Sequence, residues 1–334
     1  MGEGKRILLF SSISLMFFLI SCRSQHSADE HYILVASNLQ VPYWQTAGAG
    51  FMQEAQQMRV RAEFVGPKGY DPKAQQDEFR KAVQQKPTGI LVSPADPSLM
   101  QNDIDQAIAA GIPVITIDSD APSSKRLFFI GTNNYQAGLM GGQRLVKELQ
   151  GKGNFVVFTM PEQVNLKERL RGYLDALEDH PQIKIVQVID IKGDPRVAFD
   201  SATEIIGKKE KVDAFVCLEA QAGKEVATVL KNSGVKDKIV LAMDTDPDTL
   251  DAIQQGFIVA TISQKPFTMT NFGLRMLDDL HHYKLNSLNT DWSQDSFAPI
   301  PSFVDTGSSL IDKKNVAVFQ EFNKSMTKST AQLQ

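Results

Sequence analysis

The sequence predicts an α/β fold with two doubly wound lobes, each a parallel sheet that helices cover on both faces. Short apolar runs alternate with helical patterns from residue 31 onward, which is typical of repeated β-α-β units. The run at 114–117 is apolar at nearly every position, as expected for a strand that is buried on both sides. The candidate strands are too many for one sheet of a compact domain, so we expect two lobes.

The predicted elements follow one another along the chain. The strands are the runs rich in apolar and β-branched residues, at 31–37, 61–65, 89–93, 112–117, 127–130, 154–159, 184–190, 212–218, 238–243 and 257–263. Helical patterns, in which apolar residues recur three or four positions apart, fall at 73–85, 98–110, 135–149 and 222–231. Another helix is expected after the first strand, because Ala47, Phe51 and Ala55 share one face. A last short pair of strands is expected at 301–304 and 314–317.

The chain is expected to cross between the lobes three times. One crossing lies near Gly131, where a strand ends and a new helix opens, and another follows Gln264. The third is expected within 282–300, a polar stretch without periodicity. The resulting assignment gives 31–131 plus 265–293 to lobe one, 132–264 plus 294–323 to lobe two, and 324–334, which is rich in Ser, Thr and Gln, to a flexible tail.

The first residues have the pattern of a targeting segment. Lys5 and Arg6 precede an apolar stretch at 7–20, which has about the length of a signal-peptide core and is short for a membrane span. The stretch ends in Leu19-Ile20-Ser21-Cys22, which resembles a bacterial lipobox. We therefore expect a lipoprotein signal peptide at 1–21, a lipid on Cys22 that anchors the chain to a membrane on the periplasmic, extracytoplasmic side, and a polar tether at 22–30. The alternative is an ordinary secretory signal with an incidental cysteine.

Composition and missing motifs argue against several classes of protein. The chain has 334 residues, a net charge of −4 and no basic patch, so nucleic-acid binding has no support. Cys217 lies in an apolar run and is interpreted as a buried small side chain, which leaves no disulfide framework and no zinc-ligand spacing. Histidines near the tether and at the end of a helix are interpreted as solvated. Without a phosphate loop or a nucleophile elbow, we expect no enzyme activity, no cofactor and no metal site.

Two adjacent aromatic residues mark the junction between the first strand and the first helix. Tyr43 and Trp44 follow the strand-like run at 32–37, at the carboxyl end of that strand. Ligands of open α/β sheets bind at this edge. A flat, amphipathic ring there suits the apolar C–H face of a sugar. The alternative is that both rings only plug the top of the helix.

Six motifs occur together in one order. They are Pro42-Tyr43-Trp44, Ile112–Asp118, Gly131–Asn134, Lys167-Glu168-Arg169 followed by Gly172-Tyr173, Asp244–Asp248, and Ala260–Gln264. Over about residues 31 to 320 the chain thereby resembles the periplasmic sugar-binding proteins of ABC importers, of the ribose- and galactose-binding type with the periplasmic binding protein-like I fold. This resemblance implies a Venus-flytrap architecture, in which two lobes joined by a three-segment hinge close over one ligand.

The resemblance also implies ligand-binding residues. Tyr43 and Trp44 match paired aromatics that stack on the sugar ring, and Arg169 matches an arginine that donates to sugar oxygens. The acidic and polar positions that match the family are Asp118, Asp244 and Gln264.

Three positions depart from the family pattern. Val41 and Glu219 stand where asparagines are usual, and Ser119 replaces an arginine. The ribose pattern is therefore not preserved, and the segment 118–120 resembles relatives that bind autoinducer-2-like furanoses, branched sugars or polyols. Further ligand-binding candidates near these positions are Ser119, Asp120, Asn165 and Glu219.

The charged candidates are suited to recognising the orientation of hydroxyl groups. A carboxylate only accepts hydrogen bonds and a guanidinium only donates them, so Asp118, Asp244 and Arg169 would fix hydroxyl orientation. The acids outnumber the one certain cation, so we expect a net negative cleft that favours neutral or amino-substituted ligands over phosphates and acids. Each residue also has a structural alternative: a helix cap for Asp118, a solvated ion-pairing face for Arg169 and an Asx turn for Asp244.

These expectations favour a monomeric, extracytoplasmic solute-binding lipoprotein that captures a monosaccharide or related polyol and delivers it to an ABC permease in the inner membrane. The main alternative is the same fold feeding a sensor kinase or a chemoreceptor, and the sequence barely separates the two. A glycosidase is disfavoured because an acid facing Arg169 would stay ionised and make a poor general acid. A sugar-responsive repressor is disfavoured by the signal segment and by the lack of DNA-binding helices before the first strand.

Overall fold

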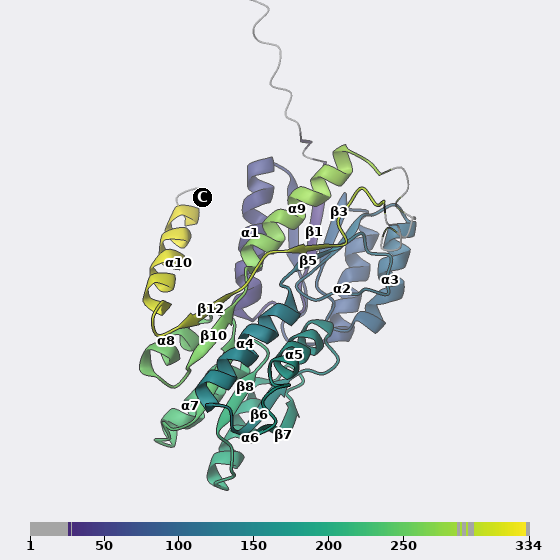
Figure 1. The fold of residues 1–334 in the computed structure, drawn as a ribbon. Helices are drawn as coiled ribbons and strands as arrows, with labels where there is room; N and C mark the ends of the chain where they lie inside the picture. Colours follow the sequence, from purple (N-terminus) through teal and green to yellow (C-terminus); the bar gives the residue numbers. More distant parts are fainter. Residues whose placement is uncertain (1–25, 28, 286–287, 289–291, 293–296, 332–334) are drawn as a thin grey trace, which may run out of the picture.

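The computed structural model describes residues 26–27, 29–285, 288, 292 and 297–331. This part of the chain forms two lobes, each built on a six-stranded sheet, with short segments between them (Figure 1). The prediction of two doubly wound α/β lobes is therefore confirmed. The predicted signal peptide, Cys22 and most of the predicted tether lie outside the described residues. Within the described part, no helix combines the length and the apolar character that a bilayer span requires.

Lobe one has an all-parallel sheet with the strand order β11-β5-β4-β3-β1-β2. Its strands are β1 (His31–Val35), β2 (Arg61–Val65), β3 (Gly89–Val92), β4 (Val114–Ile117), β5 (Phe129–Gly131) and β11 (Phe303–Asp305). Its helices are α1 (Pro42–Met58), α2 (Pro72–Gln84), α3 (Pro97–Ala109) and α9 (Pro266–His282). Helices α1 and α9 pack together, and α2 packs against α3.

Lobe two repeats this arrangement with the strand order β12-β10-β9-β8-β6-β7, in which only the edge strand β12 is antiparallel to its neighbour. Its strands are β6 (Gly153–Thr159), β7 (Ile183–Asp190), β8 (Ala214–Cys217), β9 (Ile239–Met243), β10 (Ala260–Ser263) and β12 (Ser309–Asp312). Its helices are α4 (Asn134–Leu149), α5 (Val164–Ala176), α6 (Pro195–Gly207), α7 (Ala222–Asn232), α8 (Pro247–Gln255) and α10 (Val316–Ala331).

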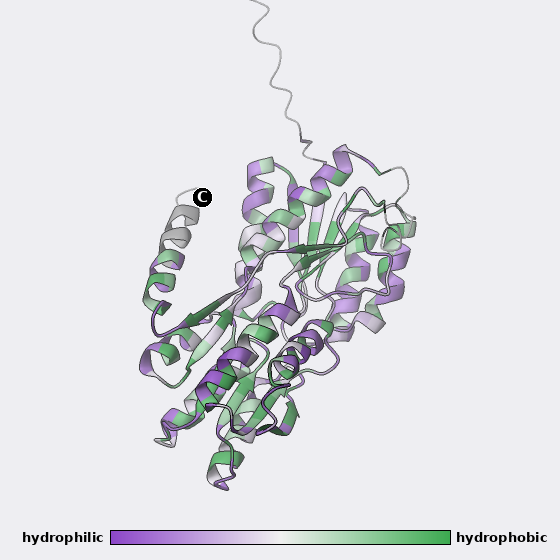
Figure 2. Ribbon diagram, viewed as in Figure 1, coloured by the Kyte–Doolittle hydropathy of each residue, from purple (hydrophilic) through white to green (hydrophobic). Residues whose placement is uncertain are grey.

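Strand β6 shows why helices cover both faces of the second sheet. Val156 and Phe158 lie in the apolar core under α6 and α7, whereas Phe155 and Val157 lie in the core under α4 and α5. Successive side chains of a strand point to opposite faces, so an apolar run such as 155–158 needs a cover on both. Figure 2 shows the result, with apolar strands enclosed by helices whose outer faces are polar. Cys217 is buried in the same core, as predicted.

The last part of the chain differs from the prediction. Residues 303–305 were assigned to lobe two, but they form β11 beside β5 in lobe one, where Phe303 stacks on Phe129 at 5.3 Å between ring centroids. The third crossing therefore lies at 306–308, between β11 and β12, and not within 282–300. The strand predicted at 314–317 is also wrong, because Val316 begins α10. Helix α10 continues through residues 324–331, which were expected to form a flexible tail.

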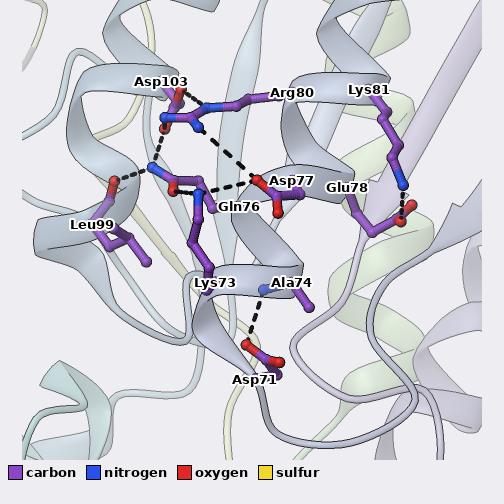
Figure 3. A network of polar contacts seen from close by, with 10 residues as sticks. All are labelled: Asp71, Lys73, Ala74, Gln76, Asp77, Glu78, Arg80, Lys81, Leu99 and Asp103. Carbon is purple, nitrogen blue, oxygen red and sulfur yellow. Dashed lines mark hydrogen bonds and ion pairs between the residues drawn. The ribbon is translucent and has the colours of Figure 1, made fainter.

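Local sequence fixes where the helices begin at the cleft. Asp71 caps α2 by accepting a hydrogen bond from the backbone N–H of Ala74 at 2.9 Å, and Pro72 follows as the first helical residue (Figure 3). Arg80 of α2 then donates to both carboxylate oxygens of the buried Asp103 on α3, at 2.7 and 3.2 Å. The cap sets the start of α2, and the ion pair joins α2 to α3.

Candidate functional site

The candidate site is a cleft at the carboxyl ends of the strands of both sheets. Lobe one lines it with Ser37, Asn38, Val41, Tyr43, Trp44, Tyr70 and Asp118. Lobe two lines it with Met160, Gln163, Asn165, Leu166, Arg169, Gly193, Glu219, Ala220, Gln221, Asp244 and Gln264. Because both lobes contribute, a molecule in the cleft contacts both at once.

Arg169 is the buried cation of the cleft, and its side chain is only 2% exposed. Its Nη1 donates to the backbone carbonyl of Leu218, and its Nη2 donates to Asn134 Oδ1 at 2.5 Å and to Gln264 Oε1 at 3.5 Å. Its Nε has no hydrogen-bond partner in the described protein. Burial lowers the pKa of Arg169, and the nearby carboxylates of Asp244 and Asp118 oppose that effect. The sequence alternative of a solvated, ion-pairing arginine is therefore wrong.

Glycines position Arg169 by bringing α4 and α5 into close contact. A Cβ atom on Gly138 would collide with the backbone carbonyl of Arg169, and one on Gly172 would collide with the carbonyl of Tyr135. The small residues let the two helices approach until Asn134, at the start of α4, reaches the guanidinium. The residues at 131–134 and 167–173 thus together hold Arg169 at the cleft.

Asp118 and Asp244 occupy equivalent positions in the two lobes. Each follows the fourth strand of its sheet, β4 or β9, and each has a left-handed backbone, with φ of 61° and 67°. The N–H of Asp118 donates to Ile130 at 3.0 Å and that of Asp244 donates to Ile262 at 2.8 Å, so the same turn is built twice. Aspartate is among the few side chains that tolerate this conformation, and strained backbone of this kind concentrates at functional sites.

Asp118 joins the aromatic pair to the cleft. Tyr43 donates its hydroxyl proton to Asp118 Oδ1 at 2.6 Å, and the Ser93 hydroxyl donates to Oδ2 at 3.2 Å. Desolvation raises the pKa of Asp118, while the Tyr43 hydrogen bond and the charge of Arg169 counteract it. Tyr43 and Trp44 form an edge-to-face pair with centroids 5.4 Å apart. Trp44 is only 4% exposed and belongs to the lobe-one core as well as to the cleft lining.

Asp244 has an unusual protonation equilibrium. Gln264 Nε2 donates to its Oδ1 at 2.9 Å, and burial raises the pKa of Asp244 to about 7 against the opposing charge of Arg169. At neutral pH the cleft therefore holds less negative charge than the residue count suggests.

We expect the free energy of unfolding to fall with rising pH because of Asp244. Its folded-state pKa of about 7 exceeds the ordinary 3.8, so its contribution is full below about pH 4 and is lost as the pH rises through about 7. Urea unfolding of the ligand-free wild type and of Asp244→Asn across this window measures the effect. Relative to the variant, the wild type should lose stability as the pH rises, and Asp248→Asn on the exposed side of α8 is the control. A difference independent of pH would contradict the prediction.

A comparison with known protein families adds a decisive observation. The model of the family described as "Periplasmic binding protein domain" matches residues 32–284. The chain belongs to this family. A curated relative of this periplasmic binding protein is the D-allose-binding periplasmic protein of Escherichia coli strain K12, which is 24% identical over 285 residues that cover 82% of this chain and 91% of the relative.

Solved structures show the same fold over nearly the whole periplasmic binding protein. AraP, an arabinose-binding protein from Geobacillus stearothermophilus, is 31% identical, with a TM-score of 0.72 over 87% of this chain and 99% of that one. A solute-binding protein of an ABC transporter from Burkholderia graminis, solved with D-arabinose, is 26% identical, with a TM-score of 0.79 over 87% of this chain and 98% of that one.

Two more predicted residues of this periplasmic binding protein line the cleft but also serve local structure. Asn165 Oδ1 accepts from the N–H of Leu166 at 3.0 Å. Glu219 accepts from the N–H groups of Gln221 and Ala222, at 2.8 and 2.5 Å, at the start of α7. Burial raises the pKa of Glu219, and these two backbone donors oppose the rise.

The structure does not bring Ser119 and Asp120 into the cleft lining. Ser119 is buried, and its N–H donates to Ser93 Oγ at 3.3 Å. Asp120 forms a two-point ion pair with the partly buried Arg126, at 2.6 and 2.7 Å, and also accepts a hydrogen bond from Thr116. The negative charge of Asp120 is balanced by Arg126 outside the cleft lining. The cleft therefore has one acidic residue fewer than predicted.

Tyr70 and Gly193 are among the cleft residues that the sequence analysis missed. The hydroxyl of Tyr70 in lobe one donates to the carbonyl of Ala95 at 3.0 Å and accepts from Nε2 of Gln163 in lobe two at 3.1 Å. Gly193 of lobe two also packs directly on the Tyr70 ring. Both residues lie in loops that follow a predicted strand, so the rule that ligands bind at the carboxyl ends of strands would have marked these loops.

Proposed function

We propose that this chain is an extracytoplasmic solute-binding protein that captures a neutral monosaccharide or related polyol between its lobes and delivers it to an ABC permease. The main support for the proposal is that aromatic, acidic and basic side chains from both lobes line the same cleft. Lobe one supplies aromatic rings and Asp118, and lobe two supplies Arg169 and Asp244. The relatives reported above are named for binding sugars, which supports the same ligand class.

The unpaired donor on Arg169 supports a ligand rich in oxygen. A buried N–H group without a partner costs about 1–3 kcal/mol, and the Nε of Arg169 is such a group among the described residues. A ring or hydroxyl oxygen of a sugar would satisfy it. The face of an aromatic ring of the pair would then lie against the C–H groups of the sugar ring, which are its apolar surface. A ligand held in this way contacts both lobes and favours the closed arrangement over an open one.

The charges of the cleft favour a neutral ligand over an anionic one. Asp118, Asp244 and Glu219 are carboxylates, and Arg169 is the cation that lies among them in the cleft lining. An entering phosphate or carboxylate would meet this acidic set, and Arg169, whose two terminal nitrogens already donate to the protein, is the one cation among the described residues of the cleft lining that would offset it. A hydroxyl group accepts from Arg169 and donates to a carboxylate, so it suits both kinds of partner.

A ligand panel with thermal unfolding and calorimetry tests the function. The panel contains D-arabinose, L-arabinose, D-allose, D-ribose, D-galactose, xylitol and glucosamine, with glucuronate and ribose 5-phosphate as anionic counterparts. We expect at least one neutral member to stabilise the protein, by about 2.7 kcal/mol at a hundredfold excess over its dissociation constant. Tight binding of an anionic member alone, or of none of the panel while an amino acid binds, would overturn the proposal.

We further propose that a lipid on Cys22 anchors the protein to the outer side of a membrane. The apolar stretch at 7–20 and the Leu19-Ile20-Ser21-Cys22 motif support this attachment. Fractionation of a bacterial host tests it by comparing Cys22→Ser with Cys217→Ser, which removes the buried thiol instead. The first variant should leave the membrane fraction and the second should stay there. Equal distribution of both variants would contradict the anchor.

A further inference from the structure

A cluster of two histidines and two carboxylates lies far from the cleft, at the amino-terminal edge of the lobe-one sheet. His26 and Glu30 belong to the segment just before β1, and Asp278 and His282 belong to the last turn and a half of α9. Figure 1 shows the end of α9 and the start of β1 at the side of lobe one that is remote from lobe two. The cluster is therefore independent of the sugar site.

The spacing of the four side chains matches the coordination shell of a small metal ion. One ligand atom from each residue can be chosen so that all four lie within 4.8 Å of one another. His26 Nε2 lies 3.0 Å from Asp278 Oδ2, and His282 Nε2 lies 3.6 Å from Glu30 Oε2 and 3.5 Å from Asp278 Oδ1. Tetrahedral bonds of about 2.0–2.1 Å place ligand atoms about 3.4 Å apart. Three of the observed separations are thus already close to those of a bound ion.

Two atoms in the cluster have no hydrogen-bond partner among the described residues. Glu30 is only 5% exposed, and its Oε1 accepts from the N–H of Ser27 at 2.8 Å, but its Oε2 accepts no hydrogen bond and faces His282. The Nε2 of His282 is likewise buried without a hydrogen bond. Buried polar atoms are almost always satisfied, so a pair of unsatisfied atoms aimed at each other indicates a missing partner.

The charge balance calls for a cation. Glu30 and Asp278 are both buried carboxylates, and among the described residues neither forms an ion pair with a lysine or an arginine. The carboxyl end of α9 adds the partial negative charge of its helix dipole. Buried charges are normally paired or bound to a metal. Tyr32 also donates to Asp278 Oδ1 at 3.1 Å, which is the kind of outer contact that orients a metal ligand.

We propose that His26, Glu30, Asp278 and His282 form a binding site for a divalent transition-metal ion, with Zn²⁺ as the ion that suits it best. Imidazole nitrogen and carboxylate oxygen in a four-ligand tetrahedral set are typical of zinc. Ca²⁺ and Mg²⁺ prefer oxygen ligands in larger shells, so they fit poorly. The bound ion would fasten the segment before β1 to α9. In sequence terms, Asp278 and His282 are four residues apart on one helix face, and the turn at Ser27 brings His26 and Glu30 to them.

Calorimetric titration with ZnCl₂ tests the site in the full chain, purified without a histidine tag and first stripped with a chelator. We expect one equivalent of Zn²⁺ to bind, and neither Mg²⁺ nor Ca²⁺ to compete. His282→Gln should weaken Zn²⁺ binding at least about tenfold. His281→Gln is the matched control, since it removes the adjacent imidazole of the same helix end, and it should leave the affinity unchanged.

Hydrogen exchange provides a second readout that does not depend on the variant. Zn²⁺ should slow the exchange of amides at 29–32 and at the end of α9, and sugar binding should be unaffected. The alternative is that the histidines are simply protonated and ion-paired with the carboxylates. In that case Zn²⁺ would bind the wild type and His282→Gln equally or not at all, and either result would overturn the proposal.

Discussion

Replacing Arg169 with methionine is expected to weaken binding of the proposed monosaccharide by about 2–5 kcal/mol, which is the usual effect of removing one partner from a buried, hydrogen-bonded charge network. The variant removes the donor that has no partner in the protein and leaves Asp118 and Asp244 without their shared counter-charge. It also leaves the Leu218 carbonyl and the Asn134 side chain without their donor. Calorimetry with the sugar that gives the largest thermal shift in the ligand panel measures the loss.

The control for this variant is Arg171→Met on the same helix. Arg171 is largely exposed, where it pairs with Glu168 at 2.6 Å and lies 4.3 Å from the centroid of the Tyr135 ring. Both variants remove a guanidinium group from α5, but only the guanidinium of Arg169 lies at the cleft. Circular dichroism of both must show an intact fold before affinities are compared. Binding by Arg169→Met within twofold of Arg171→Met would show that the arginine serves the fold and not the ligand.

The sequence was sufficient to predict the repeated β-α-β architecture because the relevant signals are local. Strands such as β4 are apolar at nearly every position, and helices such as α2 begin with an aspartate cap followed by proline. The error at the carboxyl end arose because β11 has only three residues and is stabilised by contacts distant in sequence. The stack of Phe303 on Phe129 and the hydrogen bond from Thr306 to Gly131 become visible only after folding.

The residues of the candidate site were likewise predicted only in part from the sequence. The family motifs predicted Tyr43, Arg169 and Asp244 as site residues, and all three line the cleft. Asp120 has the same local context as Asp118, but Arg126, six residues later, forms an ion pair with its carboxylate. Nothing in the local pattern shows which acid will be paired. The cluster that we propose as a metal site could not be predicted for a related reason, because its two halves are about 250 residues apart and each half alone resembles a solvated histidine near an acid.

The twofold repetition of the site explains its chemistry. Asp118 and Asp244 end equivalent strands with the same left-handed turn, so the repeated lobe architecture alone directs two carboxylates at one space. The lobes differ in what accompanies the acid. Lobe one adds Tyr43, which donates to Asp118, and lobe two adds Gln264, which donates to Asp244 and accepts from Arg169. An almost symmetric scaffold thus presents an apolar ring on one side and a donor on the other, which matches the two faces of a sugar.

Substituting alanine for Gly193 should weaken sugar binding about 5- to 150-fold by obstructing closure of the lobes. A methyl group there would meet the Cβ of Tyr70 and lie 2.5 Å from its Cγ, in the contact between lobe two and lobe one. Overpacking of this kind costs about 1–3 kcal/mol. Because the clash exists only when the lobes are together, it lowers the population of the binding-competent state, and the apparent affinity falls in proportion.

The matched control is Gly234→Ala, because it separates closure from backbone strain. Gly193 and Gly234 have nearly the same left-handed φ, 71° and 66°, but a methyl on Gly234 meets no atom within 4 Å. Both variants should lose similar stability without ligand, and only Gly193→Ala should lose affinity. In a Tyr70→Gly background, which removes the side-chain atoms that the methyl would meet, Gly193→Ala should no longer weaken binding, as a double-mutant cycle would show. Equal affinities for the two alanine variants would mean that Tyr70 and Gly193 do not meet in the ligand-bound protein, and that the lobes close in a different arrangement.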